Sequence, residues 1–182
     1  MIDAKQAQQV LEEADLLHSA AQVEQALDEL AEQINSSLAG TDPVIFCVMN
    51  GGVIPAGMLL PRLNFAFKMD YLHATRYREQ TTGNQLKWVK SNEINIANRV
   101  VLVIDDILDE GYTLEAIVDH CRQQGAAEVY SAVLADKKHD RGNHFEADFV
   151  GLDIEDRYVF GMGMDYKGYL RHLPAIYAVK GL

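Results

Sequence analysis

The stretch VVLVIDDILDEGYTL, residues 100–114, carries a buried strand directly into four carboxylates. Its first five residues are apolar, and most of them are β-branched types that favour strands. Asp105 and Asp106 follow at the expected strand end, and Asp109 and Glu110 come soon after. Like charges crowded at a buried strand end raise each other's pKa, so the adjacent pair needs compensation. Mg²⁺ with its waters would supply a cation, and a sugar with vicinal hydroxyls would supply hydrogen-bond donors.

The turn after these aspartates has the chemistry of an anion site. Gly111 permits a tight turn and a close approach of a ligand to the backbone. A helix is expected from about Thr113, and its first N–H groups and positive dipole end would face the turn. The alternative is an ordinary helix start with Asp109 or Glu110 as its cap. Capping explains one carboxylate and leaves the adjacent pair unexplained.

Strands and helices alternate along the rest of the chain. Ser19 with Gln22 predicts a capping box, at the start of a helix that ends before Gly40. Further helices are expected at 3–14, around Pro55–Pro61 and from about 113 to Gly125. Strands are expected at 44–49, 65–74, 100–104 and 128–136, with shorter candidates at 148–154, 157–163 and 174–180. This alternation implies a parallel sheet covered on both faces, with ligands at the carboxyl ends of its strands.

Composition narrows the class of protein. The length of 182 residues predicts one domain, and the net charge of −11 argues against a nucleic-acid binder. No apolar run approaches the roughly 20 residues of a membrane span, and the N-terminus lacks the apolar segment of a signal peptide. Cys47 and Cys121 are expected as buried free thiols in a reducing cytosol, so we predict a cytoplasmic location.

The opening stretch resembles the phosphoribosyl-pyrophosphate signature of the type I phosphoribosyltransferases, in which a strand, two acidic residues and a phosphate loop follow one another. Other segments resemble the hypoxanthine-guanine phosphoribosyltransferases. FCVMNGG (46–52) is similar to their first loop, Lys137 with Arg141 to their purine lysine and its following arginine, and YVFGMGMDY (158–166) with Arg171 to their C-terminal purine segment.

The resemblance covers most of residues 10–180 and implies an α/β fold. Its core is a parallel sheet at about 40–140 with helices on both faces. A small hood would come from about 1–20 and 145–182, and the whole chain, 1–182, would form a single domain.

The resemblance also implies roles for individual residues. Asp109 is the implied general base at purine N7. The residues implied to bind phosphoribosyl pyrophosphate are Asn50, Gly51, Asp105, Asp106, Glu110, Gly111, Tyr112, Thr113 and Arg171. Those implied to bind the purine are Lys137, Tyr158, Val159 and Asp165. Mg²⁺ is the implied cofactor, held by Asp105, Asp106 and Asp165.

Each role has a structural alternative. Lys137 could belong to a solvated basic loop, and Tyr158 could be a core aromatic residue. The family often has a cis peptide bond before its first loop, here Met49–Asn50, but the sequence alone favours an ordinary glycine turn. Two residues depart from the family pattern. Glu110 stands where the family usually has Thr, and Asn50 stands where several relatives have Lys.

The polar segment RYREQTTGNQLKWVK (76–90) is expected to be a long hairpin or a mobile loop. The family closes such a loop over phosphoribosyl pyrophosphate, and Tyr77 is the residue expected to seal it. We predict that residues 78–88 are mobile without ligand. The six histidines show no zinc spacing and receive no chemical role.

Together these features predict a purine-salvage enzyme that joins hypoxanthine or guanine to phosphoribosyl pyrophosphate, with IMP or GMP and pyrophosphate as products. Small-molecule substrates, a homodimer or homotetramer, and no nucleic-acid or membrane partner are expected. One alternative is a non-catalytic regulator with the same fold that senses nucleotides. A more distant one is a phosphotransfer receiver domain, which also places acidic pairs at strand ends. The preference among hypoxanthine, guanine and xanthine stays open.

Overall fold

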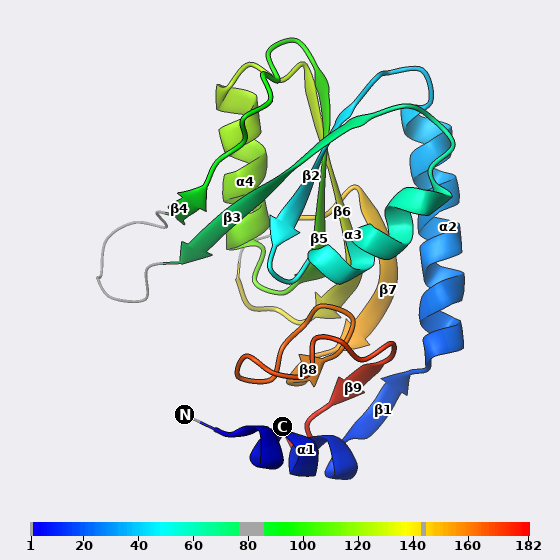
Figure 1. Cartoon of the computed structure of the whole chain (residues 1–182), viewed down its shortest axis with the longest axis vertical. Helices are drawn as coiled ribbons and strands as arrows, with labels where there is room; N and C mark the ends of the chain where they lie inside the picture. The colour runs from blue at the N-terminus through cyan, green and yellow to red at the C-terminus, as the bar shows by residue number, and fades with distance from the viewer. Residues whose placement is uncertain (1, 77–85, 143–144) are drawn as a thin grey trace.

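The computed structural model describes residues 2–76, 86–142 and 145–182, which form two β-sheets and the helices around them (Figure 1). The larger sheet has six strands in the order β4-β3-β2-β5-β6-β7. Its strands are β2 (Val44–Met49), β3 (Lys68–Arg76), β4 (Leu86–Lys90), β5 (Val100–Leu108), β6 (Glu128–Lys138) and β7 (Phe149–Glu155). Only the edge strand β4 runs antiparallel to its neighbour; the other described pairs are parallel.

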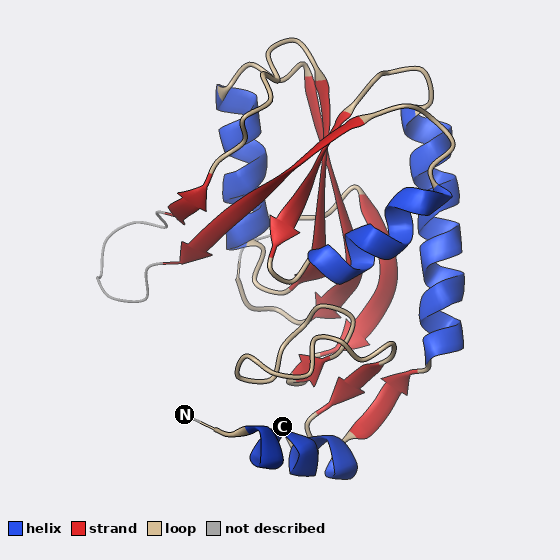
Figure 2. Ribbon diagram, in the orientation of Figure 1, coloured by secondary structure: helices blue, strands red, loops and turns tan. Residues whose placement is uncertain are grey.

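Helices cover both faces of this sheet (Figure 2). On one face lie α2 (Ala20–Leu38) and α3 (Val53–Leu59), which a short 3₁₀ turn, Leu60–Arg62, follows. On the other face lies α4 (Tyr112–Gln123). Residues of β2 alternate between the two apolar clusters: Ile45 packs toward α2 and α3, and Phe46 toward α4. This double burial explains why the strand sequences are continuous apolar runs.

The smaller sheet comes from the two ends of the chain. Its strands are β1 (Asp15–His18), β8 (Val159–Phe160) and β9 (Ile176–Ala178), in the order β1-β9-β8. Helix α1 (Ala4–Glu13) lies beside them, and Ala7 shares an apolar cluster with Phe160, Leu170 and Val179. In Figure 1 this unit lies at the carboxyl ends of the large sheet's central strands.

Most expected elements are present. Ser19 and Gln22 form the predicted capping box, and Gly125, in the left-handed region at φ +83°, follows α4. Strand β1 was not expected, because its partner β9 lies at the far end of the chain. Strand β5 continues to Leu108, so the acidic pair lies within the strand, where Asp105 is the register partner of Val133 in β6.

The expected loop at 76–90 is described only at its two ends. Strands β3 and β4 pair as a hairpin up to Arg76 and Leu86. Residues 77–85, including Tyr77, lie outside the described residues, and so does most of the segment predicted to be mobile. The described helices include none that is long and apolar enough to cross a membrane.

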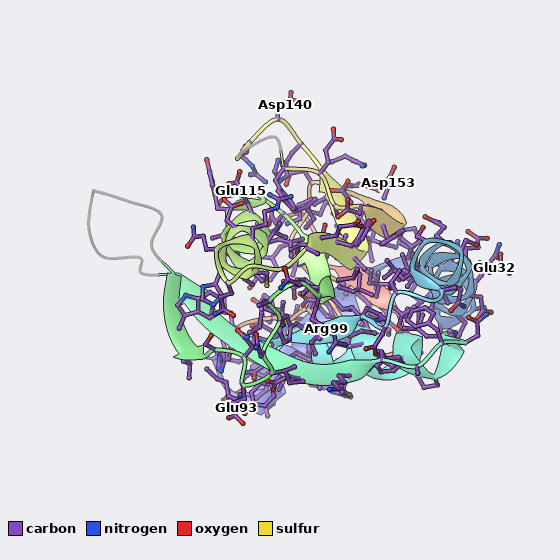
Figure 3. The ribbon with its side chains drawn as sticks, turned by 90° about the horizontal axis from the view of Figure 1, so that it is seen from above. Glu32, Glu93, Arg99, Glu115, Asp140 and Asp153 are labelled. Carbon is purple, nitrogen blue, oxygen red and sulfur yellow. The ribbon has the colours of Figure 1, made fainter. Side chains whose placement is uncertain are left out.

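Charged side chains cover the outer surface. Seen from above in Figure 3, Glu32 on α2 and Asp140 beyond β6 point outward. Both are exposed, as are Glu93 and Asp153. The acidic pair of β5 is buried instead, which separates it from the ordinary charges of this acidic chain.

Candidate active site

A cavity of about 600 Å³ lies where the carboxyl ends of the central strands meet the terminal sheet. The large sheet and its loops contribute Gly51, Asp105, Asp106, Asp109, Thr113 and Lys137. The C-terminal segment contributes Tyr158, Val159, Asp165 and Arg171. Ten residues singled out from the sequence therefore line one cavity, at the edge of the sheet where ligands of parallel-sheet proteins bind.

The acidic pair forms the floor of this cavity. Asp105 is only 9% exposed to solvent and Asp106 only 8%. Burial, followed by the charge of Asp106, raises the pKa of Asp105 well above its usual value. Burial also raises the pKa of Asp106, although a hydrogen bond with Asp105 and the charge of Arg171 oppose it. A cation or hydroxyl donors brought into the cavity would relieve this electrostatic cost.

The first loop approaches the acidic pair closely. A Cβ atom on Gly51 would lie 2.2 Å from Asp106 Oδ2, so any side chain there would displace the Asp106 carboxylate. Gly163, at φ +102°, lies against the same loop, and a Cβ on it would be 2.1 Å from the Gly51 carbonyl oxygen. The Met49–Asn50 peptide bond is cis, as the resemblance implied. The ordinary turn that the sequence alone favoured is wrong.

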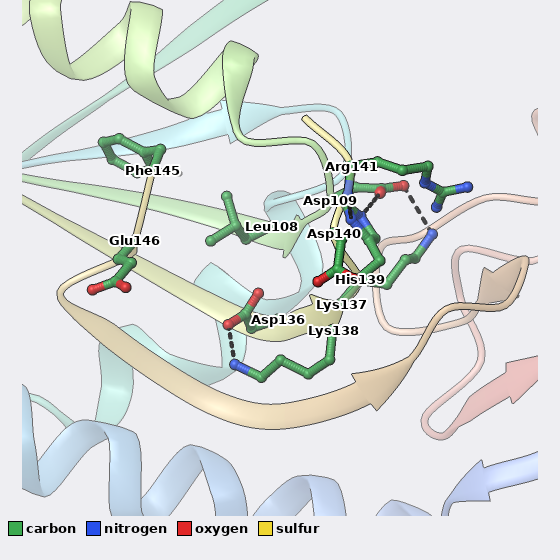
Figure 4. Close-up of a pocket in the computed structure, with 10 residues that line it drawn as sticks. All are labelled: Leu108, Asp109, Asp136, Lys137, Lys138, His139, Asp140, Arg141, Phe145 and Glu146. Carbon is green, nitrogen blue, oxygen red and sulfur yellow. Dashed lines mark hydrogen bonds and ion pairs between the residues drawn. The ribbon is translucent and has the colours of Figure 1, made fainter. Parts of the chain in front are cut away.

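Asp109 lies between two hydrogen-bond donors (Figure 4). Lys137 Nζ lies 2.8 Å from its Oδ2, and His139 Nε2 lies 2.7 Å from its Oδ1. Burial raises the pKa of Asp109, but the hydrogen bonds from Lys137 and His139 outweigh burial and bring the pKa below its usual value. The carboxylate is therefore ionised at neutral pH and can accept a proton only when a donor is held against it.

A smaller cavity of about 230 Å³ lies in the turn after β5 and is lined by Glu110, Gly111 and Thr113 among others. Gly111, at φ +81°, is the N-cap of α4, which begins at Tyr112. The alternative in which Asp109 or Glu110 caps the helix is therefore wrong. Because glycine has no side chain, the N-cap itself places no side chain in front of the helix N-terminus, where the helix dipole favours an anion. Tyr112 lines neither of these two cavities.

Arg171 and Asp165 form an ion pair on the opposite wall. Arg171 Nη2 lies 2.6 Å from Asp165 Oδ1, and Arg171 Nη1 donates to the Gly163 carbonyl at 2.5 Å. Asp165 Oδ2 also accepts a hydrogen bond from the Gly168 backbone at 2.6 Å. These contacts hold the guanidinium of Arg171 at the cavity. Its N–H groups suit an anionic ligand, which could replace Asp165 as their partner.

Comparison with known proteins agrees with this geometry. Residues 13–167 match the model of the phosphoribosyl transferase domain. The chain belongs to the phosphoribosyltransferase family. It is 32% identical to the hypoxanthine-guanine phosphoribosyltransferase of Streptococcus thermophilus over 84% of this chain and 85% of that protein. The protein of the same name from Bacillus subtilis is 29% identical over 91% of this chain and 92% of its own length.

Solved structures agree in fold as well. A crystal structure of a hypoxanthine-guanine phosphoribosyltransferase from Bacillus anthracis has a TM-score of 0.85 and is 31% identical, covering 91% of this chain and 98% of that one. A hypoxanthine phosphoribosyltransferase from Staphylococcus aureus has a TM-score of 0.88 at 25% identity, covering 99% of this chain and 97% of its own. The fold is therefore the mixed α/β fold of the type I phosphoribosyltransferases. Membership of this family overturns the receiver-domain alternative.

Asn50, one of the predicted residues, lines another cavity of this phosphoribosyltransferase. It is exposed, and this cavity of about 570 Å³ is also lined by α1 and residues 168–172. Tyr77 lies outside the described residues. Tyr158 is 41% exposed and meets the Tyr166 ring edge-on, with centroids 5.4 Å apart. Its exposure shows that the core alternative for Tyr158 is wrong.

The sequence did not predict one contact of the candidate site. His139 received no role from its sequence spacing, yet it binds the carboxylate of Asp109. The sequence signal was weak: a histidine two positions after the predicted purine lysine becomes informative only when β5 and β6 are known to be neighbours.

The carboxylate oxygens in the cavity of this phosphoribosyltransferase fit Mg²⁺ that is bound together with water and a substrate phosphate. Within the described residues, no group of three or more His, Cys, Asp or Glu side chains stands ready to hold a metal. Mg²⁺ is usually held by one or two carboxylates, several waters and substrate phosphates, and not by an all-protein cage. The buried oxygens of Asp105 and Asp106 match that arrangement.

Proposed function

We propose that this chain transfers the 5-phosphoribosyl group from phosphoribosyl pyrophosphate to hypoxanthine or guanine, which gives IMP or GMP and pyrophosphate. The observation that carries the proposal is one cavity that holds a buried acidic pair, a lysine-bound carboxylate and an arginine. The relatives named above act as support, because they bear the names of hypoxanthine-guanine enzymes and match nearly the full chain. None of them supports the regulator alternative.

Phosphoribosyl pyrophosphate occupies the side of the cavity formed by β5 and α4. Asp105 and Asp106 accept hydrogen bonds from the ribose 2′- and 3′-hydroxyls. The backbone of Glu110, Gly111, Tyr112 and Thr113 surrounds the 5′-phosphate at the N-terminus of α4, where the helix dipole favours an anion. The backbone N–H groups of Asn50 and Gly51, with Arg171, bind the pyrophosphate.

The purine occupies the side formed by Lys137 and the C-terminal segment. Tyr158 stacks on the ring and Val159 contacts its edge. Lys137 donates to the purine O6. This requires its Nζ to leave Asp109 Oδ2, which is 2.8 Å away in the structure. That exchange exposes one carboxylate oxygen to the purine N7–H and removes a hydrogen bond that lowers the pKa of Asp109.

The reaction is a substitution at ribose C1. The bond from C1 to the pyrophosphate oxygen breaks, and its electron pair leaves with pyrophosphate. The bond from C1 to purine N9 forms, while the N7 proton moves to Asp109. Arg171 stabilises the charge that develops on the leaving group.

Mg²⁺ is the proposed cofactor. Bound with phosphoribosyl pyrophosphate, it would neutralise the charge that leaves with pyrophosphate. Asp105 and Asp106 would hold it through water, and Asp165 would hold a second ion. We further propose that the protein is a homodimer or homotetramer, and sedimentation of the pure protein measures this oligomeric state. We also propose a cytoplasmic location, with which the two free, buried cysteines are consistent.

The direct test is product formation. Purified protein is incubated with phosphoribosyl pyrophosphate, Mg²⁺ and, separately, hypoxanthine, guanine, xanthine or adenine, and nucleotides are separated by chromatography. We expect IMP and GMP, and little AMP, because adenine lacks the 6-oxo group that Lys137 contacts. Absence of nucleotide from every base would overturn the proposal and revive the regulator alternative.

A further inference from the structure

His139 contacts the proposed general base from outside the substrate cavity. Its side chain is 5% exposed, and its Nε2 lies 2.7 Å from Asp109 Oδ1. Asp109 and Lys137 line both the 600 Å³ cavity and a neighbouring cavity of about 560 Å³, shown in Figure 4. His139 lines only the second of these. It therefore approaches Asp109 from behind, where it would not touch a purine.

The hydrogen-bond partners of the ring assign its proton. The backbone N–H of Arg141 donates to His139 Nδ1 at 3.0 Å, so Nδ1 must offer a lone pair. The proton of the neutral ring is then on Nε2, which donates to Asp109. Both ring nitrogens therefore have a partner, and the imidazole faces Asp109 with its donor nitrogen.

The loop that carries His139 is packed onto the loop that carries Asp109. Gly142, at φ +88°, lies so close that a Cβ atom on it would be 2.4 Å from the Glu110 carbonyl oxygen. Arg141 also forms an ion pair with Asp156 at 2.5 Å. These contacts hold the His139 imidazole in place next to the Asp109 carboxylate.

The two oxygens of Asp109 are thus divided between two donors. Under the proposed function, Lys137 leaves Oδ2 for the purine O6, and a carboxylate held only by Lys137 would then be free to rotate about its terminal torsion, which has a broad energy profile. His139 lies outside the substrate cavity, so its contact with Oδ1 can persist when the purine binds and would oppose that rotation.

We propose that His139 is a positioning residue, which holds Oδ1 of Asp109 so that Oδ2 points at the purine N7 proton once Lys137 has moved. This inference rests on the proposed function. It adds a residue to the machinery of proton transfer, and it gives the two donors on Asp109 different tasks: one is exchanged during the reaction and the other is permanent.

The test compares two substitutions. His139→Leu has similar bulk and no donor, whereas the amide nitrogen of His139→Gln can donate in place of Nε2 but cannot titrate. We expect His139→Leu to lower kcat by roughly 10- to 100-fold, the effect of a misplaced catalytic group. The KM for phosphoribosyl pyrophosphate and the Tm should stay near wild type, and His139→Gln should recover most of kcat. His18→Leu, a partly buried histidine of β1, is the matched control and should leave kcat unchanged.

Nitrogen NMR of the free protein provides a readout that does not depend on activity, and should show the His139 proton on Nε2. A proton on Nδ1 would overturn the inference. So would wild-type kcat in His139→Leu, or a loss of Tm and of phosphoribosyl-pyrophosphate affinity that His139→Gln does not restore. If the wild-type protein forms nucleotide and His139→Leu does so equally well, this inference alone fails. If the wild-type protein forms none, the proposed function fails and this inference fails with it.

Discussion

Replacing Asp109 with Asn separates a general base from a structural carboxylate, because the two roles predict effects of different size. The amide keeps one acceptor atom, whereas His139 and Lys137 both donate to the wild-type carboxylate. One donor therefore loses its acceptor. The side chain of Lys137 is 10% exposed and that of Asp109 is 43% exposed, and Lys137 can turn toward the open cavity. Because Asp109 is partly exposed and Lys137 can reach the open cavity, loss of this ion pair should lower the free energy of unfolding by roughly 1 kcal/mol or less.

The effect on catalysis should be larger. Loss of a positioned base lowers kcat by roughly 10²-fold or more, and 10²-fold corresponds to about 2.7 kcal/mol in the activation barrier. The loss of roughly 1 kcal/mol in the free energy of unfolding corresponds to a decrease in Tm of no more than roughly 2–4 °C for Asp109→Asn. The KM for phosphoribosyl pyrophosphate should change little. Steady-state kinetics with hypoxanthine and thermal unfolding of the same preparation measure both quantities.

Asp119→Asn is the matched control, because Asp119 forms a surface ion pair with Arg122 on α4, 3.2 Å apart, and both side chains are exposed. It makes the same chemical change outside the cavity and should leave kcat and Tm near wild type. If Asp109→Asn kept kcat within about threefold of wild type, the assignment of Asp109 as base would be refuted. A kcat loss accompanied by a collapse of Tm would instead assign it a structural role.

Three further predictions follow from the same geometry. Lys137→Ala should raise the KM for hypoxanthine and guanine at least tenfold and leave affinity for phosphoribosyl pyrophosphate nearly intact; calorimetric titration of each substrate checks this, and equal losses for both would make Lys137 structural. The pH dependence should differ between two kinetic parameters: kcat/KM reports the free enzyme, in which Lys137 and His139 lower the pKa of Asp109, whereas kcat reports the complex, in which Lys137 has left. The acidic fall in kcat should therefore lie at higher pH than that in kcat/KM, and coincident profiles would contradict the exchange of Lys137. Excess chelator should abolish turnover, with recovery on addition of Mg²⁺, and full activity in chelator would remove the metal from the proposal.

Local sequence predicted the features that depend on neighbours along the chain. The capping box of Ser19 and Gln22 needs residues three positions apart, and the apolar runs of β2 and β5 follow from burial on both faces. The parallel topology predicts a site at the carboxyl ends of the strands, which includes Asp105 and Asp109, and the resemblance adds Lys137 to it.

The features that were missed depend on long-range contacts. Strand β1 is short, and its pairing with β9 joins Asp15 to Ala178 across nearly the whole chain. The sequence predicts that strand β5 ends at residue 104, whereas it extends to Leu108. Aspartates are poor strand residues, and the pairing with β6 keeps these two in the sheet. The contact of His139 with Asp109 requires the register of β5 against β6 and the turn at Gly142, neither of which has a local signature.

The charges in the cavity suggest how so acidic a chain accommodates a highly charged anion. Among the described residues that line the 600 Å³ cavity, the cations are Lys137 and Arg171, and each is paired with a carboxylate, Asp109 or Asp165. In the proposed reaction each cation exchanges that carboxylate for a substrate oxygen, Lys137 for the purine O6 and Arg171 for the pyrophosphate. Each released carboxylate gains a new partner in turn, the N7 proton for Asp109 and a metal ion for Asp165. Because charges are exchanged and not newly buried, binding need not overcome the net charge of −11. The acidic pair of β5 is the exception: among the described residues no cation is bound directly to it, and the proposed Mg²⁺ would arrive with the substrate.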